Sequence, residues 1–235
     1  MAQPVLSAAA QRRFYLIGGG LMLLTVFGGF ARTYFLKSLG DSPPLGGLLH
    51  LHGLCFSAWM ILFVTQSALI TGRHLSLHRS LGYGGAVLTV LMVVLGVMVS
   101  IGQLRHSQPA PGFDPRAFLA VPLFALGVFA VNVAGGVWWR RDPAAHKRLM
   151  FIATTAMLDP AIARLPLDLL AWHPLVSSTL ADLFWVALAV FDWKRLRRLH
   201  WATVAGGAVL CASQPLALVL GETGPWLRFA EWLAK

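Results

Sequence analysis

The sequence predicts an all-α protein, a polytopic transmembrane bundle of seven helices that forms a single domain over residues 1–235. Three observations lead to this prediction. Hydrophobic residues make up 57% of the chain and charged residues only 12%, whereas a soluble domain is about 25% charged. Apolar stretches near the roughly 20 residues that cross a bilayer recur from end to end. Lys and Arg concentrate in the short segments between these stretches.

Seven stretches are predicted to be spanning helices, and the sixth is the shortest. They run approximately from Phe14 to Phe35, Leu45 to Thr71, Leu81 to Gln103, Ala117 to Trp139, Leu149 to Leu170, Val176 to Val190 and Trp201 to Leu220. The first follows a pair of arginines, as a secretory signal would, but it is too long for a signal and lacks a clear cleavage site. We therefore expect it to remain as a spanning helix.

The basic residues predict the orientation of the bundle, because cytoplasmic loops are richer in Lys and Arg. Of the 19 such residues, those predicted on the cytoplasmic side are Arg12, Arg13, Arg73, Arg79, Arg140, Arg141, Lys147, Arg148, Lys194, Arg195, Arg197 and Arg198. The other side holds Arg32, Lys37, Arg105, Arg116, Arg164, Arg228 and Lys235. The N-terminus is therefore expected in the cytoplasm and the C-terminus outside, in a multi-pass protein of a bacterial inner membrane.

Several functions are set aside on composition. The net charge of +10 lies in short clusters between apolar stretches, so the lipid bilayer, not nucleic acid, is the expected partner. Cys55 and Cys211 both lie inside apolar stretches and cannot form a disulfide framework or a cysteine-rich zinc site. No lysine lies inside a late helix, where a retinal Schiff base would need one.

The second predicted helix carries a polar stripe. His52, Cys55, Trp59 and Gln66 are spaced three, seven and fourteen residues along, which keeps them near one face of a helix. His50 lies about 200° around the helix from His52 and cannot share that face. The stripe favours His52 as the residue that points into the bundle, although both histidines are candidate cofactor ligands.

Ionisable groups at membrane depth normally face the bundle interior or a water-filled cavity, which makes them the best pointers to a site. The residues that could converge on an outward-facing cavity are Arg32, His52, Asp159, Arg164, Asp182 and Gln214, and Gln66 is a further candidate. The alternative is structural: Arg164 and Asp182 form an ion pair between helices while Arg32 reaches the lipid headgroups.

A second group of candidates lies at the predicted cytoplasmic boundary, where each basic loop is followed by a histidine. His78, His146 and His200 could together bind a metal or a haem, because neutral imidazole is a common ligand of both. His52, His78 and His146 are the predicted metal ligands. The alternative is that these histidines only contact anionic lipid headgroups beside their basic neighbours.

Two resemblances follow from these motifs. The pattern His50-Leu51-His52-Gly53, then Trp59 and Gln66, then Leu77 to Gly82, resembles uncharacterised bacterial seven-helix membrane proteins with a His-Arg-x-x-Gly motif between helices. The stretch His146 to Met150 is similar to a motif of small membrane proteins associated with haem-copper oxidase assembly. The second resemblance implies that haem or copper is handled, with His146 as the matching residue.

Three functions are therefore considered. The first is a membrane protein that binds haem or a transition metal such as copper, in redox chemistry or in assembly of a respiratory membrane complex. The second is a transporter of a small solute or protons, with the cavity of arginine, histidine and aspartate described above. The third is a non-catalytic subunit of a membrane complex. The sequence assigns no catalytic residue and does not decide whether the protein is an enzyme.

Overall fold

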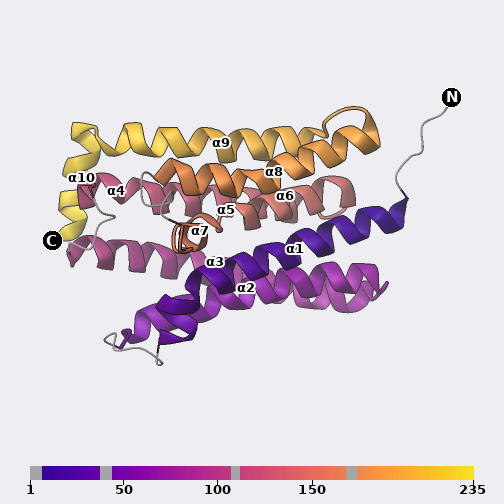
Figure 1. Cartoon of the computed structure of the whole chain (residues 1–235), viewed down its shortest axis with the longest axis horizontal. Coiled ribbons are helices and arrows are strands. Elements are labelled where there is room, and N and C mark those ends of the chain that lie inside the picture. The colour runs from indigo at the N-terminus through magenta and orange to yellow at the C-terminus, as the bar shows by residue number, and fades with distance from the viewer. Residues whose placement is uncertain (1–6, 38–43, 107–111, 168–173) are drawn as a thin grey trace.

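The computed structural model describes residues 7–37, 44–106, 112–167 and 174–235, and over these ranges the chain is helical with no strand. Long helices run side by side in one elongated bundle, with the two termini at opposite ends (Figure 1). The elements are α1 (Ala8–Phe30), a π-helical turn η1 (Ala31–Phe35), α2 (Gly47–Thr71), α3 (Leu75–Arg105), α4 (Pro115–Phe118), α5 (Ala120–Trp138), α6 (Pro143–Thr155), α7 (Asp159–Ile162), α8 (Pro174–Leu196), α9 (Trp201–Gly221) and α10 (Gly224–Ala234). We call the two ends of the bundle the N-terminal end and the C-terminal end.

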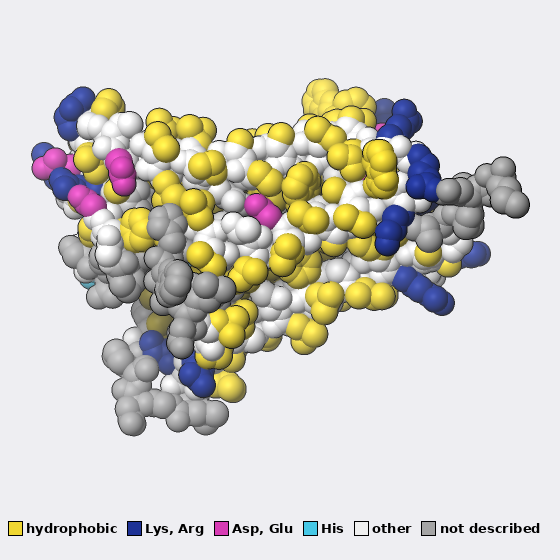
Figure 2. All heavy atoms as spheres, turned by 45° about the horizontal axis from the view of Figure 1, so that its top comes forward, with side chains coloured by type: hydrophobic (Ala, Val, Ile, Leu, Met, Phe, Trp, Pro, Cys, Tyr) yellow, Lys and Arg dark blue, Asp and Glu magenta, His cyan; other side chains and the backbone are white. Residues whose placement is uncertain are grey.

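Within the described ranges, six segments are long and apolar enough to cross a membrane. They are Ala8–Phe35, Gly47–Thr71, Leu75–Arg105, Pro115–Trp138, Pro174–Leu196 and Trp201–Gly221. Large apolar side chains point outward, with Leu24 68% and Val219 67% exposed. Hydrophobic side chains cover the middle of the face in Figure 2, while Lys and Arg gather at the two ends. An apolar belt between charged ends is the surface that a bilayer requires, so these helices indicate a multi-pass membrane protein.

The fifth predicted helix, Leu149 to Leu170, is not one continuous helix. Its last residues lie outside the described ranges, but the part before them already breaks: α6 ends at Thr155, and α7 covers only Asp159–Ile162. Pro160 causes the break, because proline has no N–H to donate and its ring clashes with the carbonyl four residues earlier. With 13 residues, α6 is about 20 Å long and cannot span the roughly 30 Å apolar layer alone.

The broken segment lies at the centre of the bundle. Helix α6 packs against α1, α5, α8 and α9, and the side chains of Arg148, Phe151, Ile152 and Thr154 are at most 1% exposed. Irregular backbone at membrane depth is tolerated only where protein or a water-filled cavity surrounds it. Burial therefore explains how the chain can accommodate Pro160 at this position.

Some predicted helix ends also shift. Helix α1 begins at Ala8, six residues before the predicted start, because the Ser7 hydroxyl accepts a hydrogen bond from the Ala10 N–H (3.1 Å) and caps the helix. The predicted helix 176–190 is longer in the structure, extending from Pro174 to Leu196.

A buried ion pair holds three helices together at the N-terminal end. The Arg148 Nε of α6 donates to both Asp192 carboxylate oxygens of α8 (3.1 and 2.9 Å), and Nη2 also donates to Asp192. Arg148 Nη1 donates to the Ala144 carbonyl (2.7 Å), and the Thr203 hydroxyl of α9 donates to Asp192 (2.5 Å). Because both charges are paired and hydrogen-bonded, the burial penalty is offset and α6, α8 and α9 are fixed relative to one another.

The C-terminal helix α10, which the sequence analysis does not predict, crosses the C-terminal end of the bundle (Figure 1). Its Leu233 carbonyl accepts hydrogen bonds from Arg105 of α3 (3.2 and 3.1 Å), and Trp226 Nε1 donates to the Arg116 carbonyl of α4 (2.9 Å). Helix α10 thus connects the ends of α3 and α4, which the sequence pattern alone leaves unconnected.

Breaking the buried ion pair should destabilise the protein strongly. In Asp192→Asn the Arg148 charge stays buried without a counterion, so we expect a loss of about 3–5 kcal/mol in the free energy of unfolding. Thermal or denaturant unfolding of the purified protein in detergent measures this loss. The double variant Arg148→Met/Asp192→Leu should recover much of it, because no unpaired charge remains. Asp114→Asn, in the exposed pair with Arg116, is the control and should change the stability little. Equal losses of stability in Asp192→Asn and Asp114→Asn would contradict the stabilising role of the buried pair.

A close contact between α1 and α7 gives a second prediction. A Cβ atom at Gly29 would overlap the carbonyl of Ala161, which is backbone and cannot rotate away. Gly29→Ala should therefore lower the free energy of unfolding by about 1–3 kcal/mol. Gly20 lies on the same helix, where an added Cβ atom would meet nothing within 4 Å, so Gly20→Ala should be neutral or slightly stabilising. Unfolding curves of both variants, recorded under identical conditions, test this prediction. Equal stabilities of Gly29→Ala and Gly20→Ala would contradict the close contact.

Candidate functional site

Two histidines from distant parts of the sequence meet at the N-terminal end of the bundle. His78 lies in the first turn of α3 and His146 in the first turn of α6. Their ring centroids are 6.2 Å apart, and the ring planes are nearly perpendicular at 88°. The predicted juxtaposition of His78 and His146 is therefore present, with the two rings supplied by two different helices.

A hydrogen bond fixes the tautomer of the neutral His146 ring. Its Nδ1 lies 2.8 Å from the Gly136 carbonyl of α5, and a carbonyl can only accept. Nδ1 therefore carries the proton, and in the neutral ring Nε2 keeps its lone pair. An imidazole whose other nitrogen donates to a backbone carbonyl is the usual arrangement of a metal-ligating histidine.

Two buried polar atoms, one on His78 and one on its neighbour Gln66, lack hydrogen-bond partners. Gln66 of α2 donates through Nε2 to the His78 carbonyl (3.1 Å), while Gln66 Oε1 and His78 Nδ1 are buried with no hydrogen-bond partner among the described residues. A buried polar atom without a partner costs free energy, so such atoms point to a missing ligand, proton or water.

His200 does not complete a three-histidine centre. It caps α9, where its Nδ1 accepts a hydrogen bond from the Ala202 N–H (3.2 Å), and its ring lies beside Trp201. Across the described part of the chain, no group of three His, Cys, Asp or Glu side chains is placed to hold a metal ion. His200 therefore acts as a helix cap and is not a third ligand.

The predicted ligand set His52, His78 and His146 is not assembled either. Gln66 contacts His78, and His52 lies fourteen residues before Gln66 on α2, which is about 21 Å along the helix axis. Because of this distance, the prediction that Gln66 belongs with the outward-facing residues is wrong. His52 is half buried, its ring lies 4.2 Å from that of Phe56, and its Nδ1 has no partner within the described ranges, whereas the side chain of His50 is exposed.

The other predicted site residues are only partly brought together. Asp182 of α8 accepts hydrogen bonds from Gln214 Nε2 (2.9 Å) and from the Cys211 thiol of α9 (3.7 Å). Asp159 and Gln214 line one cavity of about 40 Å³ between α5, α6, α8 and α9. Three of the predicted residues, Asp159, Asp182 and Gln214, thus lie in one region.

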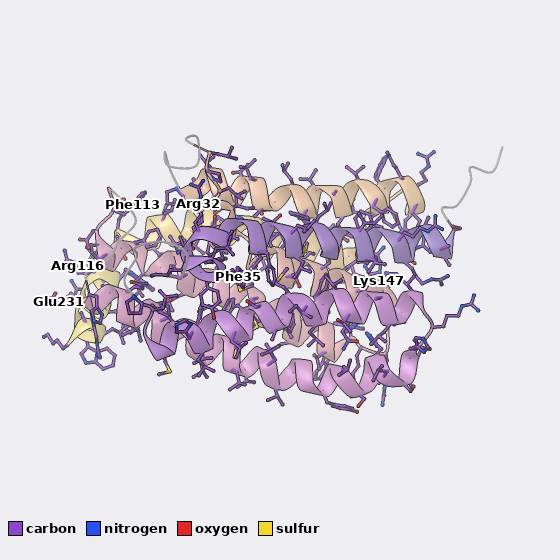
Figure 3. The ribbon with its side chains drawn as sticks, turned by 60° about the horizontal axis from the view of Figure 1, so that its bottom comes forward. Arg32, Phe35, Phe113, Arg116, Lys147 and Glu231 are labelled. Carbon is purple, nitrogen blue, oxygen red and sulfur yellow. The ribbon has the colours of Figure 1, made fainter. Side chains whose placement is uncertain are left out.

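The two predicted arginines take other positions. Arg164 donates to the Pro160 carbonyl (2.6 Å) and lies 4.8 Å from the Phe30 ring centroid. Within the described ranges the ion pairs are Arg116–Asp114 and Arg148–Asp192, so the alternative of an Arg164–Asp182 pair is wrong. Arg32 is exposed, toward the end of the bundle that holds Arg116 and Glu231, while Lys147 lies toward the opposite end (Figure 3).

The sequence pattern does not predict the Arg148–Asp192 pair. It places Arg148 among the basic residues of a loop, and Asp192 falls two residues beyond the predicted end of its helix at Val190. A usable signal is nevertheless present, because Asp192 is flanked by Phe191 and Trp193 in an apolar segment. An isolated acid in that setting needs a buried cationic partner.

No protein-family model, curated protein or solved structure matches the chain. Function must therefore be inferred from these residues and their contacts.

The capping role of His200 predicts a pH dependence of stability. Burial lowers the pKa of His200 below its usual 6.5, and the positive charge of Arg148 acts in the same direction. The unfolded chain then binds this proton more readily, so the stabilisation is present above about pH 6.5 and is lost as the pH falls further. His200→Asn keeps a capping oxygen that does not titrate.

Unfolding midpoints of the protein in detergent at about pH 7.5 and about pH 5 test this prediction. The wild type should lose more stability than His200→Asn over this interval. Replacing the exposed His106 by Asn is the control and should leave the wild-type pH dependence in place. Equal slopes for wild type and His200→Asn would count against the capping role.

Proposed function

We propose that this multi-pass membrane protein binds a transition-metal ion at its N-terminal end, with His78 and His146 as ligands. The observation that carries the proposal is the His146 Nδ1 hydrogen bond to the Gly136 carbonyl, which leaves Nε2 as a free donor atom near a second imidazole. Metal–nitrogen bonds of about 2.0–2.1 Å place two in-line imidazole centroids roughly 6 Å apart. The 6.2 Å separation suits one shared ion.

The donor atoms favour particular metals. Imidazole nitrogen suits copper, zinc, iron and nickel, and Gln66, whose amide donates to the His78 carbonyl, has an unpaired Oε1. The resemblance of His146 to Met150 to proteins of haem-copper oxidase assembly favours copper among these metals. Redox chemistry, or delivery of the ion to a respiratory membrane complex, is the role that this resemblance implies.

Haem fits less well than a bare ion. A porphyrin needs a slot that extends several ångströms around the iron, whereas α2 and α5 already contact the pair through Gln66 and Gly136. We therefore assign the histidine pair to a bare ion.

The proposal also includes the topology. In this topology, the six long helices and the broken α6–α7 segment make seven crossings. The basic loops at the N-terminal end favour a cytoplasmic location for that end. The proposed metal site then lies at the cytoplasmic face of a bacterial inner membrane. Its ion would be drawn from the cytoplasm.

Metal binding by the purified protein tests the proposal. The metal-free protein in detergent is titrated with copper(I) under reductant, copper(II) and zinc(II), and bound metal is counted after desalting. One ion per chain is expected, and His78→Ala and His146→Ala should each weaken binding at least tenfold. His106→Ala, near the opposite end, and His200→Ala should bind as the wild type does.

Circular dichroism of each variant separates loss of the site from loss of the fold. Wild-type affinity in both His78→Ala and His146→Ala would overturn the proposal. A Soret band that depends on His146 would overturn the choice of a bare ion over haem.

A further inference from the structure

The cavity at the end of α6 lies in the part of the bundle where the backbone is broken. Among its lining residues, Thr155 ends α6, Asp159 begins α7, Ser178 belongs to α8, and Ser213 and Gln214 belong to α9. The remaining lining residues are mostly apolar. The polar groups therefore converge from several helices on a space that is otherwise hydrophobic.

The hydroxyl groups of this cavity offer acceptor atoms but no free proton. The Thr155 hydroxyl donates to the Phe151 carbonyl (3.1 Å), and the Ser213 hydroxyl donates to the Leu210 carbonyl (2.7 Å). Ser178 has two acceptors in reach for one proton, the Pro174 carbonyl (3.1 Å) and the Asp159 carboxylate. Their oxygens thus present lone pairs only.

Gln214 and Asp159 add further acceptor oxygens. One N–H of the Gln214 amide donates to Asp182 (2.9 Å), and the amide keeps its second N–H and its acceptor oxygen Oε1. Asp159 Oδ1 is buried and has no hydrogen-bond partner in the described part of the chain. A cavity lined mainly by acceptors around an unpaired carboxylate oxygen is complementary to a positively charged ligand, whereas an anion would be repelled.

Asp159 forms no direct ion pair with any described residue. The Arg164 charge acts on Asp159 without contact, because its guanidinium donates to the Pro160 carbonyl and lies over Phe30. Asp182, the other carboxylate of this region, is already hydrogen-bonded to Gln214 and Cys211. One carboxylate without a direct ion pair matches a single positive charge, since divalent cations take six or more oxygens and usually more than one carboxylate.

The size of the cavity is consistent with a small ligand. Its volume of about 40 Å³ compares with the roughly 10–15 Å³ that one water needs. It therefore accommodates a small ion or a few waters. Broken helices that expose oxygens at membrane depth are the setting in which membrane transporters hold their coupling ions.

From these observations, we propose that the cavity at Asp159, Ser178, Ser213 and Gln214 binds a small monovalent cation of the size of Na⁺. Asp159 supplies the charge and the other side chains supply neutral oxygens. This site lies at the opposite end of α6 from the His78–His146 pair and is independent of it. Because the cation would bind beside the break between α6 and α7, this segment is the part of the bundle that we expect to move in a transport function.

The experiment measures the unfolding midpoint of the full-length protein in detergent at fixed pH. Choline chloride is replaced stepwise by NaCl, LiCl or KCl at constant ionic strength. A saturable rise in the midpoint with Na⁺ is expected for the wild type, because a ligand that binds only the folded state stabilises it. The same rise is expected in His146→Ala, which separates this site from the metal proposal.

Asp159→Asn should abolish the saturable response, and Ser213→Ala and Gln214→Leu should each raise the half-saturating Na⁺ concentration at least threefold. Asp114→Asn, which neutralises an exposed carboxylate, is the matched control and should respond as the wild type does. The Ser213 and Gln214 variants keep the test valid if Asp159→Asn does not fold.

Two results would overturn the proposal. One is the same Na⁺ response in wild type and in all three cavity variants. The other is a wild-type midpoint that ignores Na⁺, Li⁺ and K⁺ but rises as the pH is lowered in a manner that requires Asp159, which would make the cavity a proton site.

Discussion

The burial of Arg148 against Asp192 is the constraint on which the rest of the bundle depends. An arginine whose side chain is 2% exposed must have a counterion and hydrogen-bond acceptors around it, and it obtains them from α8 and from the α6 backbone, while Thr203 of α9 donates to the same carboxylate. These bonds fix the height and rotation of α6 relative to its neighbours. Packing of apolar side chains alone would not fix the position of α6 along its axis. Lipid tails are as apolar as its neighbours, so no hydrophobic driving force selects one position.

Both candidate sites take their geometry from this fixed helix. His146 lies two residues before Arg148 and faces α3, while Thr155 lies seven residues after it, two helical turns further along, at the cavity. A short buried helix therefore carries a nitrogen donor near its start and ends at an oxygen-lined space. The two sites are chemically different, because one offers imidazole and the other carboxylate and hydroxyl oxygen.

Hydropathy is sufficient to predict the six long spanning helices, because a lipid-facing surface demands near-continuous apolar sequence. It predicts one continuous helix from Leu149 to Leu170 and misses the break between α6 and α7, since hydropathy does not register that Pro160 ends a helix. The loop positions do predict the approach of His78 to His146. The sequence pattern does not show that Gln66 and His52 belong to different sites, because residues on one helical face can still lie far apart along the axis.

The composition of α6 has a consequence for how the chain enters the membrane. His146, Lys147 and Arg148 lie in its first two turns, and the buried Arg148 is costly in apolar surroundings until its charge is paired. Asp192, which neutralises Arg148, is synthesised 44 residues later. We therefore expect α6 to settle into the bundle only after α8 has left the ribosome, so that late synthesis of one carboxylate controls the insertion of an earlier segment.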